Sequence, residues 1–115
     1  MQKDLPTGQL SNRRASISND VLNCLAEHRI SDSEWRCLLV IWQKTYGQLV
    51  EKAFIFPEEF AINTCLPEPV ITRALDRLAQ QNIILRNAPF TDGRRMYACN
   101  ERVEFWNLIR PSPID

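Results

Sequence analysis

A pair of helical patterns within residues 54–82 constrains the fold of this chain more than any other feature. The first helix is expected over residues 58–65, with Pro57 at its first position, where a missing backbone N–H has no cost. A second proline, Pro67, disfavours helical geometry in the residue before it and so separates the two helices. The second helix begins at Glu68 and is amphipathic. Apolar residues recur along one of its faces at helical spacing: Ile71, Ala74, Leu75 and Leu78, with Val70 and Ala79 at the margins.

This arrangement predicts a helix-turn-helix. Two short helices joined by a tight turn, the second presenting polar and basic residues to solvent, are typical of that motif. The polar side of the second helix carries Thr72, Arg73, Asp76, Arg77 and Gln80, and the inward positions of the first are expected to be Phe60, Ala61 and Thr64. A helical hairpin of this size can also be an ordinary core element, so the residues that follow matter.

Those residues predict a β-hairpin. Asn82 is suited to the left-handed conformation that ends helices. Two apolar runs follow, 83–86 and 96–99, with the turn 91–94 between them. Asp-Gly between two apolar runs is a strong hairpin signal. A helix-turn-helix followed directly by a hairpin is a winged helix. We therefore predict a mainly α fold with a small antiparallel sheet, in which residues 54–56 supply the third strand.

Another helix is expected near the N-terminus, over residues 20–28, with Ser18 or Asn19 as its cap. Its inner stripe is expected to be Val21, Leu22, Leu25 and Ala26. The residues before it, 1–16, lack periodicity and are interpreted as a flexible N-terminal arm.

The helix that follows is predicted to be the centre of the core. Ser31 and Glu34 form a capping-box pattern that begins it, and it then covers residues 35–46 and ends at Gly47. It is apolar around most of its circumference, and a helix of that kind is buried. Its two tryptophans are expected to fill the core, with an aromatic ligand pocket as the alternative; they are Trp35 and Trp42.

The length of 115 residues suits one domain with a modest core. The winged helix is expected over residues 17–110, followed by a C-terminal tail, 111–115. The formal net charge is zero, so the overall composition does not indicate nucleic acid. No apolar run reaches the roughly 18 residues of a membrane span, and no secretory signal opens the chain. We expect a cytoplasmic protein that does not contact membranes.

Cysteine and histidine content does not favour a metal site. The four cysteines lie far apart in the sequence, whereas zinc ligands usually come in closely spaced pairs. They are expected to be buried, reduced thiols: Cys24, Cys37, Cys65 and Cys99. His28 has no partner near it in sequence and is expected at a helix C-terminus, where a cation is favoured. The sequence contains no recognisable nucleophile–base pair, carboxylate dyad or cofactor fingerprint. Neither an enzyme nor a cofactor is expected.

Two motifs point to a known family. The first is Lys44-Thr45-Tyr46-Gly47, at the end of the central helix, and the second is Thr72-Arg73-Ala74-Leu75, with Thr64 and Leu66 fitting the turn. With these motifs, residues 13–99 resemble the N-terminal winged-helix domain of phage replication protein O and related replisome organisers. The resemblance implies a domain that recognises origin DNA and has replication proteins as partners. In that family a separate C-terminal region engages the helicase machinery, and the matched residues do not imply that role.

The chain departs from the family pattern in three ways. Cys65 stands where the turn usually has glycine, which is compatible with the fold only if its backbone avoids left-handed geometry. Pro67 and Pro69 stand where small polar residues usually cap and open the second helix. Glu68 and Asp76 place acid on the face that would approach DNA, which weakens attraction to phosphates. Carboxylates can nevertheless accept a hydrogen bond from cytosine N4.

Two hypotheses follow. The first is sequence-specific binding of double-stranded DNA, in replication initiation or in transcriptional control. Its major-groove contacts would come from Glu68, Pro69, Thr72, Arg73 and Asp76. Arg77 would lie near phosphates, and the wing residues Arg86, Arg94 and Arg95 would contact the backbone or the minor groove. Arg13 and Arg14 form either a basic arm along the DNA or a solvated one. The second hypothesis is a protein-interaction module, favoured by the neutral net charge and the acids on the second helix.

The final segment, residues 101–109, either closes the core or forms a seam for a second copy of the chain. Its apolar residues are Val103, Phe105, Trp106 and Ile109. Two large aromatic residues so close together exceed what one short helix needs. We therefore favour a homodimer through Phe105, Trp106 and Ile109, or side-by-side assembly on DNA, over a monomer in which these side chains only close the core.

Overall fold

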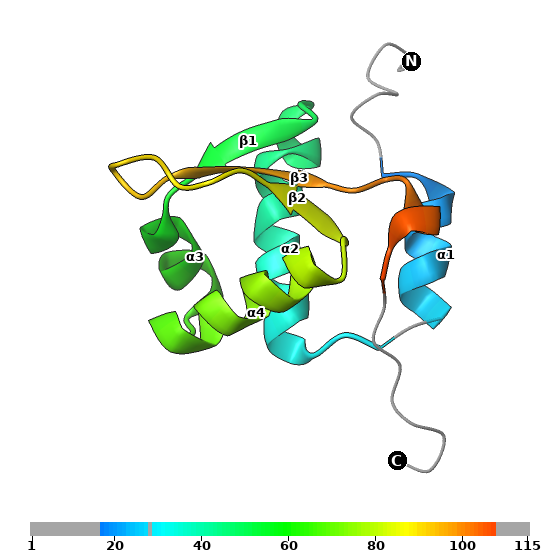
Figure 1. Ribbon diagram of the computed structural model, residues 1–115, viewed down its shortest axis with the longest axis horizontal. Coiled ribbons are helices and arrows are strands. Elements are labelled where there is room, and N and C mark those ends of the chain that lie inside the picture. Colours follow the sequence, from blue (N-terminus) through cyan, green and yellow to red (C-terminus); the bar gives the residue numbers. More distant parts are fainter. Residues whose placement is uncertain (1–16, 28, 108–115) are drawn as a thin grey trace, which may run out of the picture.

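The computed structural model describes residues 17–27 and 29–107. Three short antiparallel strands form a sheet with the order β1-β3-β2, and the helices lie beneath it (Figure 1). This is a mainly α winged helix-turn-helix, as the sequence predicted. The elements are α1 (Asn19–Glu27), α2 (Asp32–Lys44), η3 (Tyr46–Gln48), β1 (Lys52–Ile55), α3 (Pro57–Thr64), α4 (Glu68–Gln80), β2 (Ile84–Arg86), β3 (Arg95–Cys99) and η4 (Val103–Phe105).

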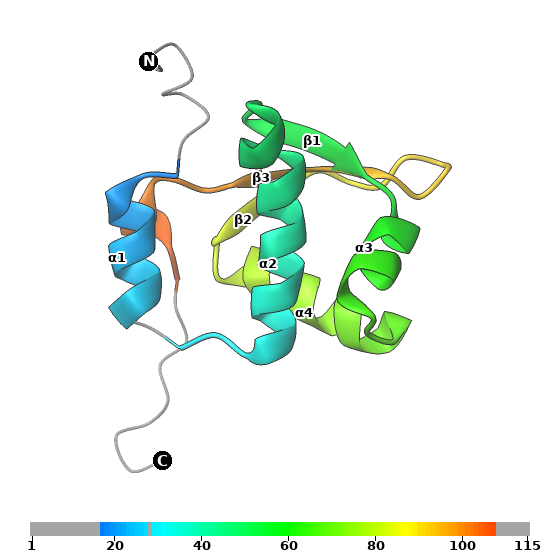
Figure 2. The ribbon, with the colours of Figure 1, turned by 180° about the vertical axis from the view of Figure 1, so that it is seen from behind.

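Helix α2 is the centre of the molecule, with α1 on one side and α3 on the other (Figure 2). Its predicted capping box is confirmed: the Ser31 backbone N–H donates to Glu34 Oε1 at 2.7 Å, and the Glu34 N–H donates to Ser31 Oγ at 3.2 Å. The helix ends at Lys44, two residues before the predicted end. Thr45 caps it there, and its hydroxyl donates to the Ile41 carbonyl.

The expectation that α2 is buried nearly all round is wrong. Leu39 is 51% exposed and Trp35 is 38% exposed. The sheet, α3 and α4 cover the rest of the helix, where Cys37, Leu38, Val40, Ile41 and Trp42 are buried. Trp35 packs edge-on against Trp42, with ring centroids 5.8 Å apart, so this tryptophan pair closes the margin of the core.

Helix α1 is capped by Ser18, whose Oγ accepts from the Val21 N–H at 3.2 Å. Only half of its predicted inner stripe is buried. Val21 and Leu25 lie in the core, whereas Leu22 and Ala26 are exposed. The helix contacts η4 and otherwise has few neighbours among the described residues, so it buries a narrow stripe. His28 lies outside the described residues.

The turn between α3 and α4 contradicts one expectation drawn from the resemblance. Cys65 adopts φ 60°, ψ 27°, which is the left-handed geometry that it was expected to avoid. Thr64 helps to hold the turn, because its hydroxyl donates to the Phe60 carbonyl and accepts from the Leu66 N–H. Ala61, predicted to point inward, is exposed, whereas Phe60 and Thr64 are buried.

The wing consists of β2, residues 87–94 and β3. Its tip is a tight turn, in which the Gly93 N–H donates to the Phe90 carbonyl at 2.9 Å and the Phe90 N–H donates to the Arg94 carbonyl at 2.8 Å. Gly93 has φ 94°, a conformation that side chains disfavour, so the Asp-Gly signal marked the turn correctly. The third strand is β1, which pairs with β3 and aligns Phe54 with Met96. It covers residues 52–55 and is shifted from the predicted 54–56.

The C-terminal segment packs onto the core instead of presenting a seam. Trp106 is 9% exposed, and its indole N–H donates to the Asn100 carbonyl at 2.7 Å. The placement of Trp106 in an exposed seam was therefore wrong. Phe105 is 57% exposed, and Ile109 lies outside the described residues. The homodimer itself stays a prediction.

The cysteines also differ from expectation. Cys37 and Cys99 are buried and Cys24 is half-buried, but Cys65 is exposed at the turn. Burial raises the pKa of the Cys37 thiol to about 11. Within the described part of the chain, no group of three or more potential ligands could hold a metal ion. The helices of that part are also too short or too polar to cross a membrane.

Candidate nucleic-acid interface

The outward side of α4 gathers the residues predicted to contact bases. Glu68, Pro69, Thr72 and Arg73 are all exposed, and with Asp76 they line one shallow hollow. We call these five residues the outer face of α4. They lie together because the opposite stripe of the helix is buried against the core, as the spacing of its apolar residues predicted.

Two charged residues of the outer face are uncommitted. Glu68 and Arg73 make no side-chain hydrogen bond or ion pair with any described residue. They stand five positions apart, on the first two turns of the second helix of a helix-turn-helix. In such motifs these turns approach base edges.

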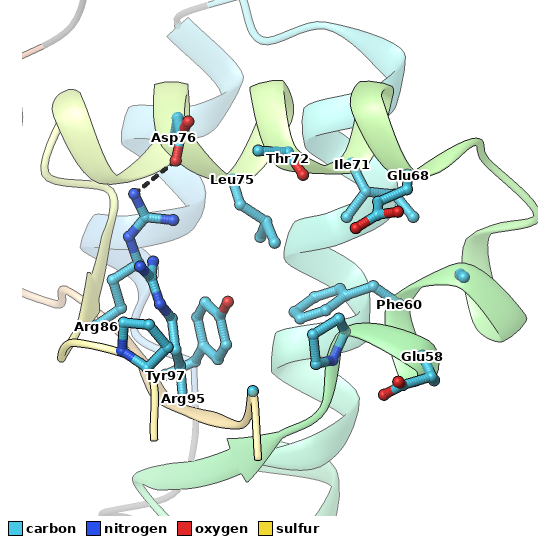
Figure 3. A pocket seen from close by; sticks show the side chains of 14 residues that line it. Glu58, Phe60, Glu68, Ile71, Thr72, Leu75, Asp76, Arg86, Arg95 and Tyr97 are labelled. Atoms are coloured by element: carbon cyan, nitrogen blue, oxygen red, sulfur yellow. Dashed lines mark hydrogen bonds and ion pairs between the residues drawn. The ribbon is translucent and has the colours of Figure 1, made fainter. Parts of the chain in front are cut away.

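The third charge of the outer face, on Asp76, is neutralised by the wing. Arg86 Nη2 donates to Asp76 Oδ1 at 2.7 Å, across the gap between α4 and β2 (Figure 3). Asp76 makes no ion pair with Arg73, three positions earlier on the same helix. The Arg86 pair removes one of the two acids that argued against DNA binding and ties the wing to α4.

Arg77 has a structural partner as well. Its Nε lies 3.3 Å from Oε2 of Glu34, a carboxylate only 2% exposed at the start of α2. The Gln81 side chain donates to the same oxygen at 3.2 Å. Arg77 therefore fastens α4 to α2, and the phosphate contact predicted for it stays a prediction, because 49% of its side chain is exposed. The capping-box pattern identified Glu34 but did not reveal that its second oxygen is buried against α4.

The two adjacent wing arginines differ in their surroundings. The Arg94 guanidinium lies 5.2 Å from the Phe54 ring centroid and 4.9 Å from that of Phe90, and its Nε is 3.4 Å from Asp92 Oδ2. These contacts hold Arg94 against the wing, with 40% of its side chain exposed. Arg95 points to the other side of β3, and its side chain makes no hydrogen bond or ion pair with the described residues. Arg13 and Arg14 lie outside the described residues.

A cavity of about 400 Å³ separates α4 from α3 and the wing. The sequence did not predict it, because its walls come from three elements distant in the chain. Its floor is apolar and its rim is charged, with Arg86 and Arg95 at one end and Glu58 and Glu68 at the other (Figure 3). Burial raises the pKa of the Tyr97 hydroxyl, and the positive charges of Arg95 and Arg86 oppose that rise. The floor is formed by Phe60, Ile71, Leu75 and Tyr97.

Comparison with known families adds to this geometry. The sequence profile of bacteriophage replication protein O matches residues 8–106. The chain belongs to this family. The match includes every helix and strand described above, so the replication protein O family shares the whole winged helix rather than the helix-turn-helix alone. Membership gives the chain a role in phage replication. No curated protein and no solved structure matches the chain.

Proposed function

We propose that the chain binds double-stranded DNA through the outer face of α4 and the wing, and that it recognises a replication origin. The observation that carries the proposal is the uncommitted Arg73 beside Thr72, on the first turns of the second helix of a helix-turn-helix. A major groove admits one α-helix, and an arginine at this place reaches base edges. Membership of a phage replication family makes origin DNA the target that fits best.

The charge distribution supports this proposal more than composition does. The two acids that weaken attraction to phosphates are unequal, since Arg86 pairs with Asp76 and leaves Glu68 as the free acid of the outer face. Arg73 and Arg95 contribute two cations without partners among the described residues. A single helix-turn-helix reaches high specificity mainly when it is duplicated on DNA. Homodimer formation, or binding of several copies side by side, is therefore part of the proposal.

The experiment begins with selection from a randomised pool of duplexes, followed by affinity measurements on the selected duplex. Arg73→Ala is expected to weaken binding by about 1–3 kcal/mol, the range for a well-placed base contact. Arg29→Ala is the matched control, because Arg29 is an exposed arginine in the loop between α1 and α2. Equal affinities for Arg73→Ala and the control on every duplex would exclude Arg73 from the interface. A wild-type chain that enriches no duplex would refute the proposal as a whole.

The cavity favours a second candidate function, in which a partner protein inserts a side chain between α3, α4 and the wing. An apolar floor with a few convergent polar groups is typical of binding sites. Glu58 separates the two functions, because it lines the cavity from α3 and does not belong to the outer face of α4. Under the partner hypothesis, Glu58→Lys impairs assembly with purified replication proteins of the phage and leaves affinity for the selected duplex within about twofold. Weaker binding to the selected duplex with unchanged assembly would instead indicate that DNA occupies this cavity.

A further inference from the structure

The outer face of α4 offers two free charges of opposite sign, and they suit different bases. Of its charged residues, Asp76 is held by Arg86, whereas Glu68 and Arg73 make no side-chain hydrogen bond or ion pair with the described residues. No described residue therefore competes with DNA for these two side chains. We propose that Arg73 contacts a guanine and Glu68 contacts a cytosine, so that these two residues set the sequence preference of the site. This inference rests on the proposed DNA-binding function.

The base assigned to Arg73 follows from donor and acceptor patterns. A guanidinium carries only donors. Guanine is the base that presents two acceptors, O6 and N7, side by side in the major groove. Arg73 is exposed and has no described partner to compete for its donors. A bidentate contact with guanine satisfies two of them at once.

The base assigned to Glu68 follows by the same reasoning with the sign reversed. An ionised carboxylate only accepts hydrogen bonds. Cytosine presents the N4 amino group as a donor, with no acceptor of its own beside it in the major groove. Adenine also presents an amino group, but its N7 acceptor lies next to it and repels the carboxylate. Guanine and thymine offer acceptors, which Glu68 rejects.

The spacing of the two residues limits the distance between the two bases. Glu68 and Arg73 are five residues apart on one helix, which corresponds to a rise of roughly 7.5 Å. Base pairs are about 3.4 Å apart along the duplex. A recognition helix lies in the major groove at an angle to the duplex axis, so this rise sets an upper limit, and the guanine and the cytosine are expected within about two base-pair steps of each other. Thr72 and Pro69 lie between them on the outer face, where a thymine methyl group would make an apolar contact.

Unlike an arginine, Glu68 lowers affinity for DNA in general while favouring one base. A free acid near the phosphates weakens binding to every duplex, and a correct cytosine offsets that cost on the cognate one. Removing the charge with Glu68→Gln is expected to strengthen binding to unrelated duplexes. The same change is expected to reduce discrimination at the cytosine position by roughly fivefold or more. Arg73→Ala is expected to weaken binding to both kinds of duplex.

The test is selection from a randomised duplex pool with wild type, Glu68→Gln, Arg73→Ala and Glu51→Gln, followed by affinities on single-base variants of the selected site. Glu51 is the matched control, because it is an exposed acid in the loop before β1 and makes no described ion pair. The expected result is a guanine and a cytosine within about two steps of each other in the wild-type site. Glu68→Gln, but not the control, loses the cytosine preference.

Three results distinguish the possible failures. A wild-type chain that enriches no sequence refutes the proposed function itself. An enriched site that stays unchanged in Glu68→Gln, with its cytosine preference intact, overturns the role of Glu68 and leaves DNA binding standing. A site that lacks a guanine whose preference depends on Arg73 overturns that assignment in the same way. Circular dichroism spectra of all variants confirm that each is folded.

Discussion

The outer face of α4 and the wing carry similar side chains but use them differently. On α4, Arg73 projects from the helix without a described partner. In the wing, Arg86 is paired with Asp76, and Arg94 is stacked on Phe54 and Phe90. The comparison teaches that the number of arginines near a surface does not measure its capacity to bind DNA. The relevant quantity is the number of cations that are not already satisfied within the protein.

The largest expected effect is on stability and distinguishes two arginines of α4, Arg77 and Arg73. Arg77→Ala removes a donor from the buried Glu34 carboxylate and is expected to lower the free energy of unfolding by about 1–3 kcal/mol. Arg73→Ala removes an exposed side chain without partners and is expected to change it by less than about 0.5 kcal/mol. Urea denaturation of both variants measures the difference. Equal stabilities would show that the Glu34 contact contributes nothing.

The next prediction compares two wing arginines, Arg95 and Arg94, by the salt dependence of DNA binding. Arg95→Ala is expected to reduce the slope of log affinity against log salt by about 0.9, the value of one phosphate contact. Arg94→Ala is expected to leave the slope nearly unchanged, because its guanidinium is held by two rings and Asp92. The sequence alone predicted DNA contacts from both arginines. The structure leads us to expect that only Arg95 changes the salt slope. Titrations at several salt concentrations decide between the two outcomes.

The third prediction concerns Arg86, whose charge is released when its ion-pair partner is removed. Asp76→Asn leaves Arg86 without its ion-pair partner, so that its charge acts on DNA. The salt slope is expected to steepen by up to about 0.9, and affinity for unrelated duplexes is expected to rise. Asp32→Asn is the control, because Asp32 pairs with Arg36 on α2 in a similar exposed ion pair. Equal slopes for the two variants would mean that Arg86 does not reach the DNA.

The smallest effect concerns α3, which supports the turn before α4. The hydrogen bond from Lys44, and then that from the Phe56 N–H, hold the pKa of Glu59 below its usual value. A lowered pKa means that this stabilisation is present above the unfolded pKa and is lost as pH falls through the folded one. Wild type is therefore expected to exceed Glu59→Gln in stability by less than about 1 kcal/mol near pH 6. The gap is expected to narrow between pH 6 and pH 3, as the pH falls below the unfolded pKa.

Glu58→Gln is the control for that measurement, since Glu58 is the exposed neighbour of Glu59 and has no described ion pair. Denaturant unfolding at both pH values compares the two variants. A gap between wild type and Glu59→Gln that stays undiminished at pH 3 would contradict the assigned cause.

Much of the fold could be predicted from the sequence because its signals are local. The capping box of α2, the apolar stripe of α4, the left-handed Asn82 and the Asp-Gly turn all depend on residues a few positions apart. The positions of the base-contacting candidates on α4 followed from helical periodicity for the same reason.

The rest could not be predicted because it depends on contacts between distant segments. Asp76 pairs with Arg86, ten positions away, and not with Arg73 on the same turn of helix. Arg77 meets an acid 43 positions earlier in the chain, a structural contact that helical periodicity did not reveal. Trp106 is buried in a core cluster that includes residues of α1 and α2, far from it in the chain. No local pattern specifies these pairings.

The left-handed backbone of Cys65 has an evolutionary consequence. This geometry strains a residue with a side chain, whereas glycine, the usual residue of the turn in this family, adopts it freely. Cysteine and glycine codons differ by a single base, so one nucleotide substitution would relieve roughly 1–2 kcal/mol of strain. The outer face of α4 would be untouched by that change. A phage that acquired it could then tolerate substitutions on α4 that alter its DNA preference at a similar cost in stability.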